Sequence, residues 1–122
     1  MILADTSVWV DHFRSGNTEL QKALNKGQIV THPWIVAELA LGSLRDRPNT
    51  LGMLDNLPGV RVAQISELRS VIETRHLYSV GIGLVDAHLI ASVFLSPPTL
   101  LWTKDRCLRR VAEGFGIHAR LS

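Results

Sequence analysis

Short apolar runs typical of β-strands alternate with helix-like patterns along all 122 residues of the chain. This alternation indicates an α/β fold with a parallel sheet, because parallel strands require crossover connections that are usually helical. The strand runs are apolar throughout, as expected when helices cover both faces of the sheet. The predicted strands are residues 2–4, 29–31, 60–63, 100–103 and 117–119. The predicted helices are residues 7–13, 18–26, 33–44, 48–57, 67–78, 84–95 and 106–115.

The composition indicates one compact domain spanning residues 1–122. A hydrophobic content of 46% supplies a core, and a charged content of 20% is too low for a disordered protein. The single cysteine, Cys107, cannot form an intramolecular disulfide, which favours a reducing compartment. The longest largely apolar stretch, residues 80–95, contains Asp86 and is too short to span a bilayer. We therefore expect a soluble, cytoplasmic protein that does not enter a membrane.

Four acidic residues stand in or directly after apolar segments: Asp5, Glu38, Asp86 and Asp105. Asp5 follows the first predicted strand and Asp105 follows the fourth, whereas the other two fall in the first turns of predicted helices. A carboxylate in apolar surroundings is costly unless it is paired or bound to a cation. Since ligands bind at the carboxyl edge of open parallel sheets, all four acids could converge there around one shared cation.

Each acid also has a purely structural explanation. Asp5 and Asp105 could cap helices, and Asp86 could complement a helix dipole. Glu38 could form a buried salt bridge, because its helix is predicted to have almost no solvent-exposed face. The coincidence of four such acids favours the cation. Mg²⁺ and Mn²⁺ prefer oxygen ligands, whereas the sequence lacks the histidine and cysteine spacings of zinc sites.

The basic residues indicate a phosphate-rich partner. The chain has 13 Lys and Arg against 11 acids, so metal binding by four acids would leave an excess of six positive charges. Arginine, the commoner of the two, suits phosphate best. The candidates for holding a nucleic-acid backbone near the acids are Arg14, Arg45, Arg47, Lys104, Arg106 and Arg109. Trp9, Trp34 and Trp102 also lie near these acids in sequence, and each is expected in the core rather than stacked on bases.

The segments around the acids resemble the four motifs of PIN-domain nucleases. These segments are MILADTS (residues 1–7), ELALG (residues 38–42), DAHLIAS (residues 86–92) and TKD (residues 103–105). Their order, their spacing and the chain length are similar to those of VapC-type toxins of bacterial toxin–antitoxin pairs. No single motif is specific, but four in order over the whole chain are.

The resemblance implies a three-layer α/β/α PIN fold around a central parallel sheet of about five short strands. It also implies a Mg²⁺- or Mn²⁺-dependent endoribonuclease that leaves a 5′-phosphate, forms a homodimer and pairs with a VapB-type antitoxin. The implied catalytic and metal-binding residues are Asp5, Glu38, Asp86 and Asp105, with supporting hydroxyls from Thr6, Ser7 and Thr103. Many relatives carry a further acid where this chain has Cys107, so the resemblance leaves open whether the site holds one metal ion or two.

Two other functions fit the same residues. A receiver-like phosphoacceptor domain also places acids and a threonine around Mg²⁺ at strand ends, but it normally needs an adjacent acidic pair, and Asp5 is followed by Thr6. A non-catalytic RNA- or protein-binding module on the same fold is the second alternative. It would gain by losing negative charge from an RNA groove, so four intact carboxylates disfavour it.

Overall fold

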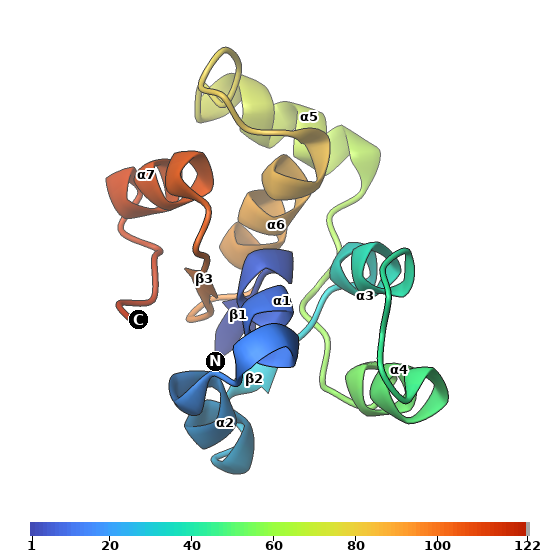
Figure 1. The fold of residues 1–122 in the computed structure, drawn as a ribbon. Coiled ribbons are helices and arrows are strands. Elements are labelled where there is room, and N and C mark those ends of the chain that lie inside the picture. Colours follow the sequence, from blue (N-terminus) through green and yellow to red (C-terminus); the bar gives the residue numbers. More distant parts are fainter. Residues whose placement is uncertain (122) are drawn as a thin grey trace.

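The computed structural model describes residues 1–121, in which three short parallel strands form a sheet surrounded by seven helices (Figure 1). The strands are β1 (Ile2–Ala4), β2 (Ile29–Val30) and β3 (Leu100–Trp102), and their order is β2–β1–β3. The central strand, β1, pairs through Ile2 with Ile29 on one side and Leu100 on the other. Strands that are far apart in sequence therefore end at a common edge.

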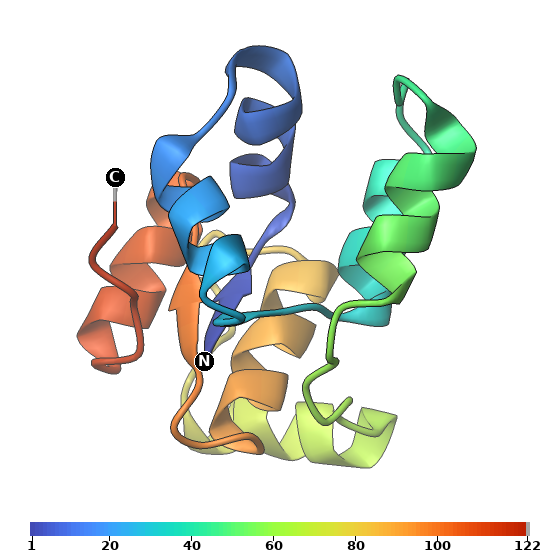
Figure 2. The same ribbon diagram turned by 90° about the horizontal axis from the view of Figure 1, so that it is seen from below.

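The helices are α1 (Thr6–Ser15), α2 (Thr18–Asn25), α3 (Pro33–Ala40), α4 (Arg47–Asp55), α5 (Ile65–Thr74), α6 (Leu84–Phe94) and α7 (Arg106–Gly114). All seven were predicted from the sequence. Figures 1 and 2 show α1 and α2 on one side of the sheet and α5 and α6 on the other. Apolar strands are thus covered on both faces, as their composition predicted.

The prediction of about five strands is wrong, because three form. Residues 60–63 and 117–119 do not become strands, although the chain at or beside each segment makes one bridge to an edge of the sheet. Thr31 makes a single parallel bridge with Gly59, and Leu101 makes one with His118. Each contact comprises two backbone hydrogen bonds around one residue, which is too short for a strand.

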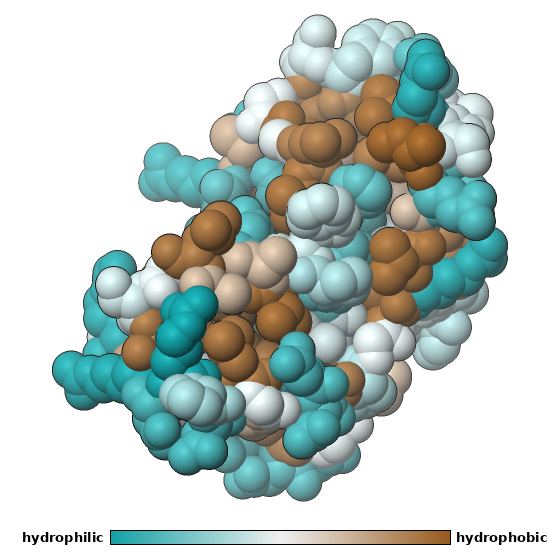
Figure 3. All heavy atoms as spheres, turned by 90° about the vertical axis from the view of Figure 1, so that its right-hand side faces the viewer, coloured by the Kyte–Doolittle hydropathy of each residue, from teal (hydrophilic) through white to brown (hydrophobic). Residues whose placement is uncertain are grey.

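Two of the three tryptophans are in the core, as predicted. Trp9 and Trp102 are fully buried, whereas Trp34 on α3 is 47% exposed. Other large apolar side chains, Leu41, Ile65 and Leu84 among them, are also exposed. Figure 3 shows brown apolar patches on the face that includes α3, α4 and α5. Among residues 1–121, no helix is long and apolar enough to cross a membrane.

Candidate active site

Asp5 lies directly after β1 and caps the N-terminus of α1. It is 5% exposed, and its Oδ1 accepts hydrogen bonds from the backbone N–H groups of Ser7 (3.0 Å) and Val8 (3.4 Å) and from the Ser7 hydroxyl. Burial raises the pKa of the Asp5 carboxyl above its ordinary value, while the hydrogen bonds from Ser7, Thr103 and Val8 oppose that rise. The helix cap expected for Asp5 is therefore present, but it coexists with a costly buried charge.

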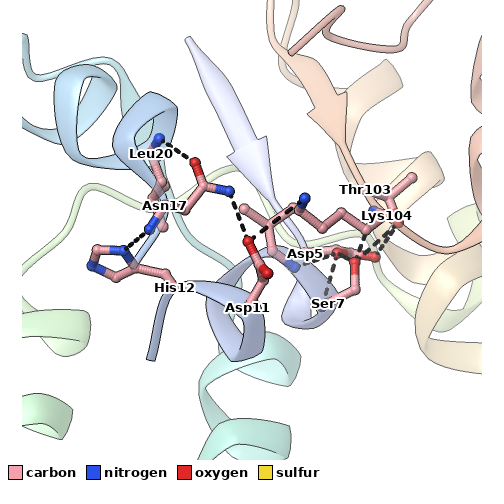
Figure 4. Close-up of polar contacts among 9 residues, drawn as sticks. Asp5, Ser7, Asp11, His12, Asn17, Leu20, Thr103 and Lys104 are labelled. Carbon is pink, nitrogen blue, oxygen red and sulfur yellow. Dashed lines mark hydrogen bonds and ion pairs between the residues drawn. The ribbon is translucent and has the colours of Figure 1, made fainter. Parts of the chain in front are cut away.

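Thr103 joins Asp5 to the end of β3 (Figure 4). Its hydroxyl donates to Oδ2 of Asp5 at 2.6 Å, and its Oγ1 accepts from the backbone N–H of Asp105 at 3.0 Å. Ser7 closes the same network, since its hydroxyl oxygen accepts from the backbone N–H of Lys104 at 2.9 Å. The predicted supporting hydroxyls of Ser7 and Thr103 thus hold the ends of β1 and β3 together.

Asp105 is exposed and caps α7, where its Oδ1 accepts from the backbone N–H of Leu108 at 2.9 Å. Its Oδ2 makes no hydrogen bond within residues 1–121. Capping is the structural role expected for this residue, and it leaves one carboxylate oxygen available. A third acid, Asp86, lies in the first turn of α6 and accepts from the backbone N–H of Gly83 at 3.2 Å.

The other three acids act electrostatically on Asp86. Burial is the largest cause that raises the pKa of its half-buried carboxyl, and the hydrogen bond from Gly83 opposes it. The negative charges of Asp105, Asp5 and Glu38 raise this pKa further. Such mutual repulsion is expected when carboxylates from separate segments face the same site.

Glu38 differs from its predicted surroundings. The expectation of a helix with almost no exposed face is wrong, because Glu38 and the neighbouring Trp34 and Ala37 are all exposed on α3. The hydroxyl of Thr6, next to Asp5 in sequence, donates to Oε1 of Glu38 at 2.6 Å. This bond spans from α1 to α3 and leaves Oε2 without a hydrogen bond in the described part of the chain. The third predicted supporting hydroxyl therefore contacts a site acid too.

The four acids have no basic partner among residues 1–121. The ion pairs there are Arg61–Glu67, Lys104–Asp11 and Arg109–Glu113. None involves a site acid, so the alternative of a buried salt bridge for Glu38 is wrong. Unpaired carboxylates that repel one another favour a bound cation over a purely structural role.

Comparison with known proteins assigns the chain to a family. The model of the PIN domain family matches residues 2–114. The chain belongs to the PIN domain family. Ribonuclease VapC32 of Mycobacterium tuberculosis, in strains CDC 1551 and H37Rv, is 38% identical over 117 residues, which cover 96% of this chain and 94% of the relative.

The donor set of this PIN domain fits a hard divalent cation. Carboxylates and hydroxyls are oxygen donors, and Mg²⁺ typically takes one or two carboxylates and keeps several waters. No three His, Cys, Asp or Glu side chains in residues 1–121 stand close enough to ligate one ion together. A site with few direct carboxylate ligands and several waters is therefore the arrangement that these side chains suit.

A second polar network beside the PIN site was not predicted from the sequence. Asp11 accepts from the side-chain amide of Asn17 at 3.1 Å and pairs with the Lys104 ammonium at 3.6 Å (Figure 4). Asp11 lies four positions after Ser7, so helical spacing places both on one face of α1. This helical spacing from Ser7 is the sequence signal from which Asp11 could have been predicted. The ion pair commits Lys104 to the protein rather than to a ligand.

The raised pKa of Asp86 predicts how the metal-free PIN domain responds to pH. Its folded-state pKa lies above the ordinary value of 3.8, so the folded chain binds the proton more tightly than the unfolded chain. Stability is then lost as pH rises from about that value through the folded pKa. We expect the free energy of unfolding of Asp86→Asn, relative to wild type, to increase over this window and then stay constant. Denaturant unfolding of both proteins at pH 4 to 8, with a chelator present to keep the site free of metal, measures this difference in the free energy of unfolding. An Asp86→Asn protein less stable than wild type at pH 7 would contradict the expectation.

Proposed function

We propose that this PIN domain is a metal-dependent endoribonuclease that acts as the toxin of a type II toxin–antitoxin pair. The observation that carries the proposal is the set of four unpaired carboxylates, from four separate segments, near the ends of β1 and β3. The 38% identity to a protein named ribonuclease VapC32, over nearly the whole chain, supports the same activity.

In this proposal Asp5, Asp86 and Asp105 surround the divalent cation, Mg²⁺ or Mn²⁺, with one or two of them binding it directly and the rest binding it through water. When bound, the ion supplies the positive charge that stabilises the developing negative charge on the phosphate and lowers the pKa of the attacking water. Asp5 is the anchor, because hydrogen bonds to both of its oxygens fix its orientation before any ion binds. Ser7 and Thr103 serve as positioning residues that act through Asp5.

Glu38 is the general base. Its Oε1 is held by the Thr6 hydroxyl, so Oε2 is the atom that takes the proton from the attacking water. In-line attack then breaks the P–O3′ bond and leaves a 5′-phosphate, while the departing 3′-oxygen takes a proton from solvent water and becomes a 3′-hydroxyl. Thr6 orients Glu38 through this hydrogen bond. Because Thr6 is the next residue after Asp5, the bond also fixes the position of the proton acceptor relative to the Asp5 carboxylate.

The proposal includes a VapB-type antitoxin, a homodimer and a cytoplasmic location. The exposed apolar side chains of Trp34, Ile65 and Leu84, which lie on α3, α5 and α6, support a protein–protein interface. The brown patches in Figure 3 lie on this side of the molecule. Cyclic dimers are the commonest closed assemblies of a single chain.

Removal of divalent metal is expected to abolish RNA cleavage, and added Mg²⁺ or Mn²⁺ is expected to restore it. Binding to the folded state also predicts stabilisation by about 2.7 kcal/mol when free Mn²⁺ is a hundredfold above its Kd. Thermal melts with and without Mn²⁺ measure this without reference to activity, and Asp86→Asn should melt with a smaller shift. Cleavage that persists in excess chelator would argue against the proposal.

The same experiments separate the alternatives. RNA binding without cleavage at any metal concentration would identify a non-catalytic module. A receiver-like domain would instead be labelled by a small phosphoryl donor. The PIN family membership and the absence of an acidic neighbour beside Asp5 both disfavour that alternative.

A further inference from the structure

A groove leads away from the candidate active site between α1 and the α3–α4 segment. Its volume is about 570 Å³, and Thr6 and Glu38 line it together with residues from the loop that joins α3 to α4. A volume of this size falls in the range that holds a small ligand, roughly 300–1,000 Å³. Figure 2 shows α1 on one side and α3 with α4 on the other. The groove is therefore continuous with the proposed general base.

The groove combines apolar walls with two arginines. Val10 and Phe13 of α1 line one side, Leu44 lines the other, and the arginines are Arg14 and Arg45. Phe13 is half-buried against the Trp9 ring, with centroids 5.7 Å apart, which fixes its position. Glu38 is the only acid among the lining residues. Charge and polarity thus change from acidic at the Glu38 end to basic and apolar along the groove.

Arg14 and Arg45 are the two predicted phosphate-binding residues that both line the groove and lack a partner in the described part of the chain; Arg106 is also unpaired there but lies outside the groove. Lys104 and Arg109 are paired with acids. The guanidinium of Arg47 donates to the backbone carbonyls of Ala40 (2.6 Å) and Gly42 (3.3 Å). By contrast, neither Arg14 nor Arg45 uses its guanidinium in a hydrogen bond or ion pair within residues 1–121, and both are exposed.

The loop that carries Arg45 is braced by the chain itself. The two bonds from Arg47 hold the end of α3, and the Thr50 hydroxyl donates to the backbone carbonyl of Arg45 at 2.9 Å. An arginine on a fixed backbone loses less conformational entropy when it binds a ligand. Its planar guanidinium matches the oxygens of a phosphate.

We propose that this groove binds the single-stranded RNA next to the cleaved bond, with Arg14 and Arg45 holding flanking phosphates and Val10, Phe13 and Leu44 contacting an unstacked base. Apolar and aromatic surfaces beside basic side chains are how proteins hold unpaired nucleotides. The inference rests on the proposed nuclease function and identifies which basic residues position its substrate. Arg14 and Arg45 are positioning residues, because neither is placed at the reacting atoms.

The test measures binding of a short, labelled, mixed-sequence oligoribonucleotide to the Asp5→Asn protein at several salt concentrations. Adding Arg14→Ala or Arg45→Ala should weaken binding about tenfold each, as expected for one charge-assisted contact. Each should also reduce the slope of log affinity against log salt by about 0.7. Arg69→Ala, an exposed arginine on α5 outside the groove, is the matched control and should change neither. Arg45→Lys should restore the slope but only part of the affinity.

Kinetics on the otherwise wild-type chain separate this inference from the nuclease proposal. Arg14→Ala and Arg45→Ala should raise KM with little change in kcat, and thermal melts should match wild type because both side chains are exposed. Suppose that wild type cleaves RNA but both variants bind RNA with the affinity and salt slope of Arg69→Ala. The groove then does not bind RNA, and a protein segment becomes the alternative occupant. If the arginines control binding but no RNA is cleaved, the groove stands and the nuclease proposal falls.

Discussion

Replacing Asp5 with asparagine is expected to reduce RNA cleavage by about 10³-fold while leaving the protein folded. Loss of one preorganised electrostatic group in an active site typically has an effect of this size, and Asp5 is the most firmly oriented of the four acids. The change removes the charge that would hold the cation but keeps the size of the side chain. Single-turnover cleavage of an RNA oligonucleotide at saturating Mg²⁺ measures the loss.

The structure also predicts what Asp5→Asn does to stability. Asparagine caps helices about as well as aspartate, so the bonds from the backbone of Ser7 and Val8 can be kept. Burial and the raised pKa of Asp5 mean that its charge costs free energy in the metal-free protein at neutral pH. The melting temperature of the variant in chelator should therefore equal or exceed that of wild type. A variant that unfolds would show that Asp5 is chiefly a structural cap.

Replacing Glu38 with glutamine is expected to lower kcat by roughly 10²–10⁴-fold, the usual contribution of a general base. The amide oxygen can still accept the 2.6 Å bond from Thr6, so the side chain should keep its place and lose only its basicity. The affinity for RNA and the Mn²⁺-dependent shift in melting temperature should change little.

The control for Glu38→Gln is Glu73→Gln, an exposed acid on α5 whose side chain makes none of the described hydrogen bonds or ion pairs. This variant should cleave RNA normally. A rise in KM with unchanged kcat would instead assign Glu38 to substrate binding. That result would leave the attacking water without a base from this chain.

The helices were predictable because their start and stop signals are local. Pro33 begins α3 and Asp105 caps α7, as each residue's backbone preference requires. The predicted end of α3 was too late, because the loop after Ala40 is held by Arg47, whose contacts with Ala40 and Gly42 no local pattern reveals. The two missing strands failed for a similar reason. The apolar character of a segment does not show whether one residue or several will form backbone hydrogen bonds with the neighbouring strand.

The candidate site was predictable in its residue types and not in its contacts. Apolar segments broken by Asp5, Glu38, Asp86 and Asp105 indicated the acids, and strand ends indicated their meeting place. The partner of each hydroxyl depends on tertiary packing: Thr6 contacts Glu38 and not its neighbour Asp5, while Thr103 contacts Asp5 from 98 positions away. The exposure of Glu38 and Trp34 likewise depends on how α3 packs against α1 and α4, which periodicity does not specify.

The bond between Thr103 and Asp5 has a consequence for how the protein is made. Because β1 is the central strand and β3 its last partner, one edge of β1 stays open on the ribosome until residues 100–105 have been synthesised. Long-range pairing of this kind cannot precede the arrival of its second segment. A nascent chain therefore passes through most of its own translation without an assembled catalytic centre. An enzyme that cleaves RNA is therefore expected to be inactive while most of its own mRNA is being translated.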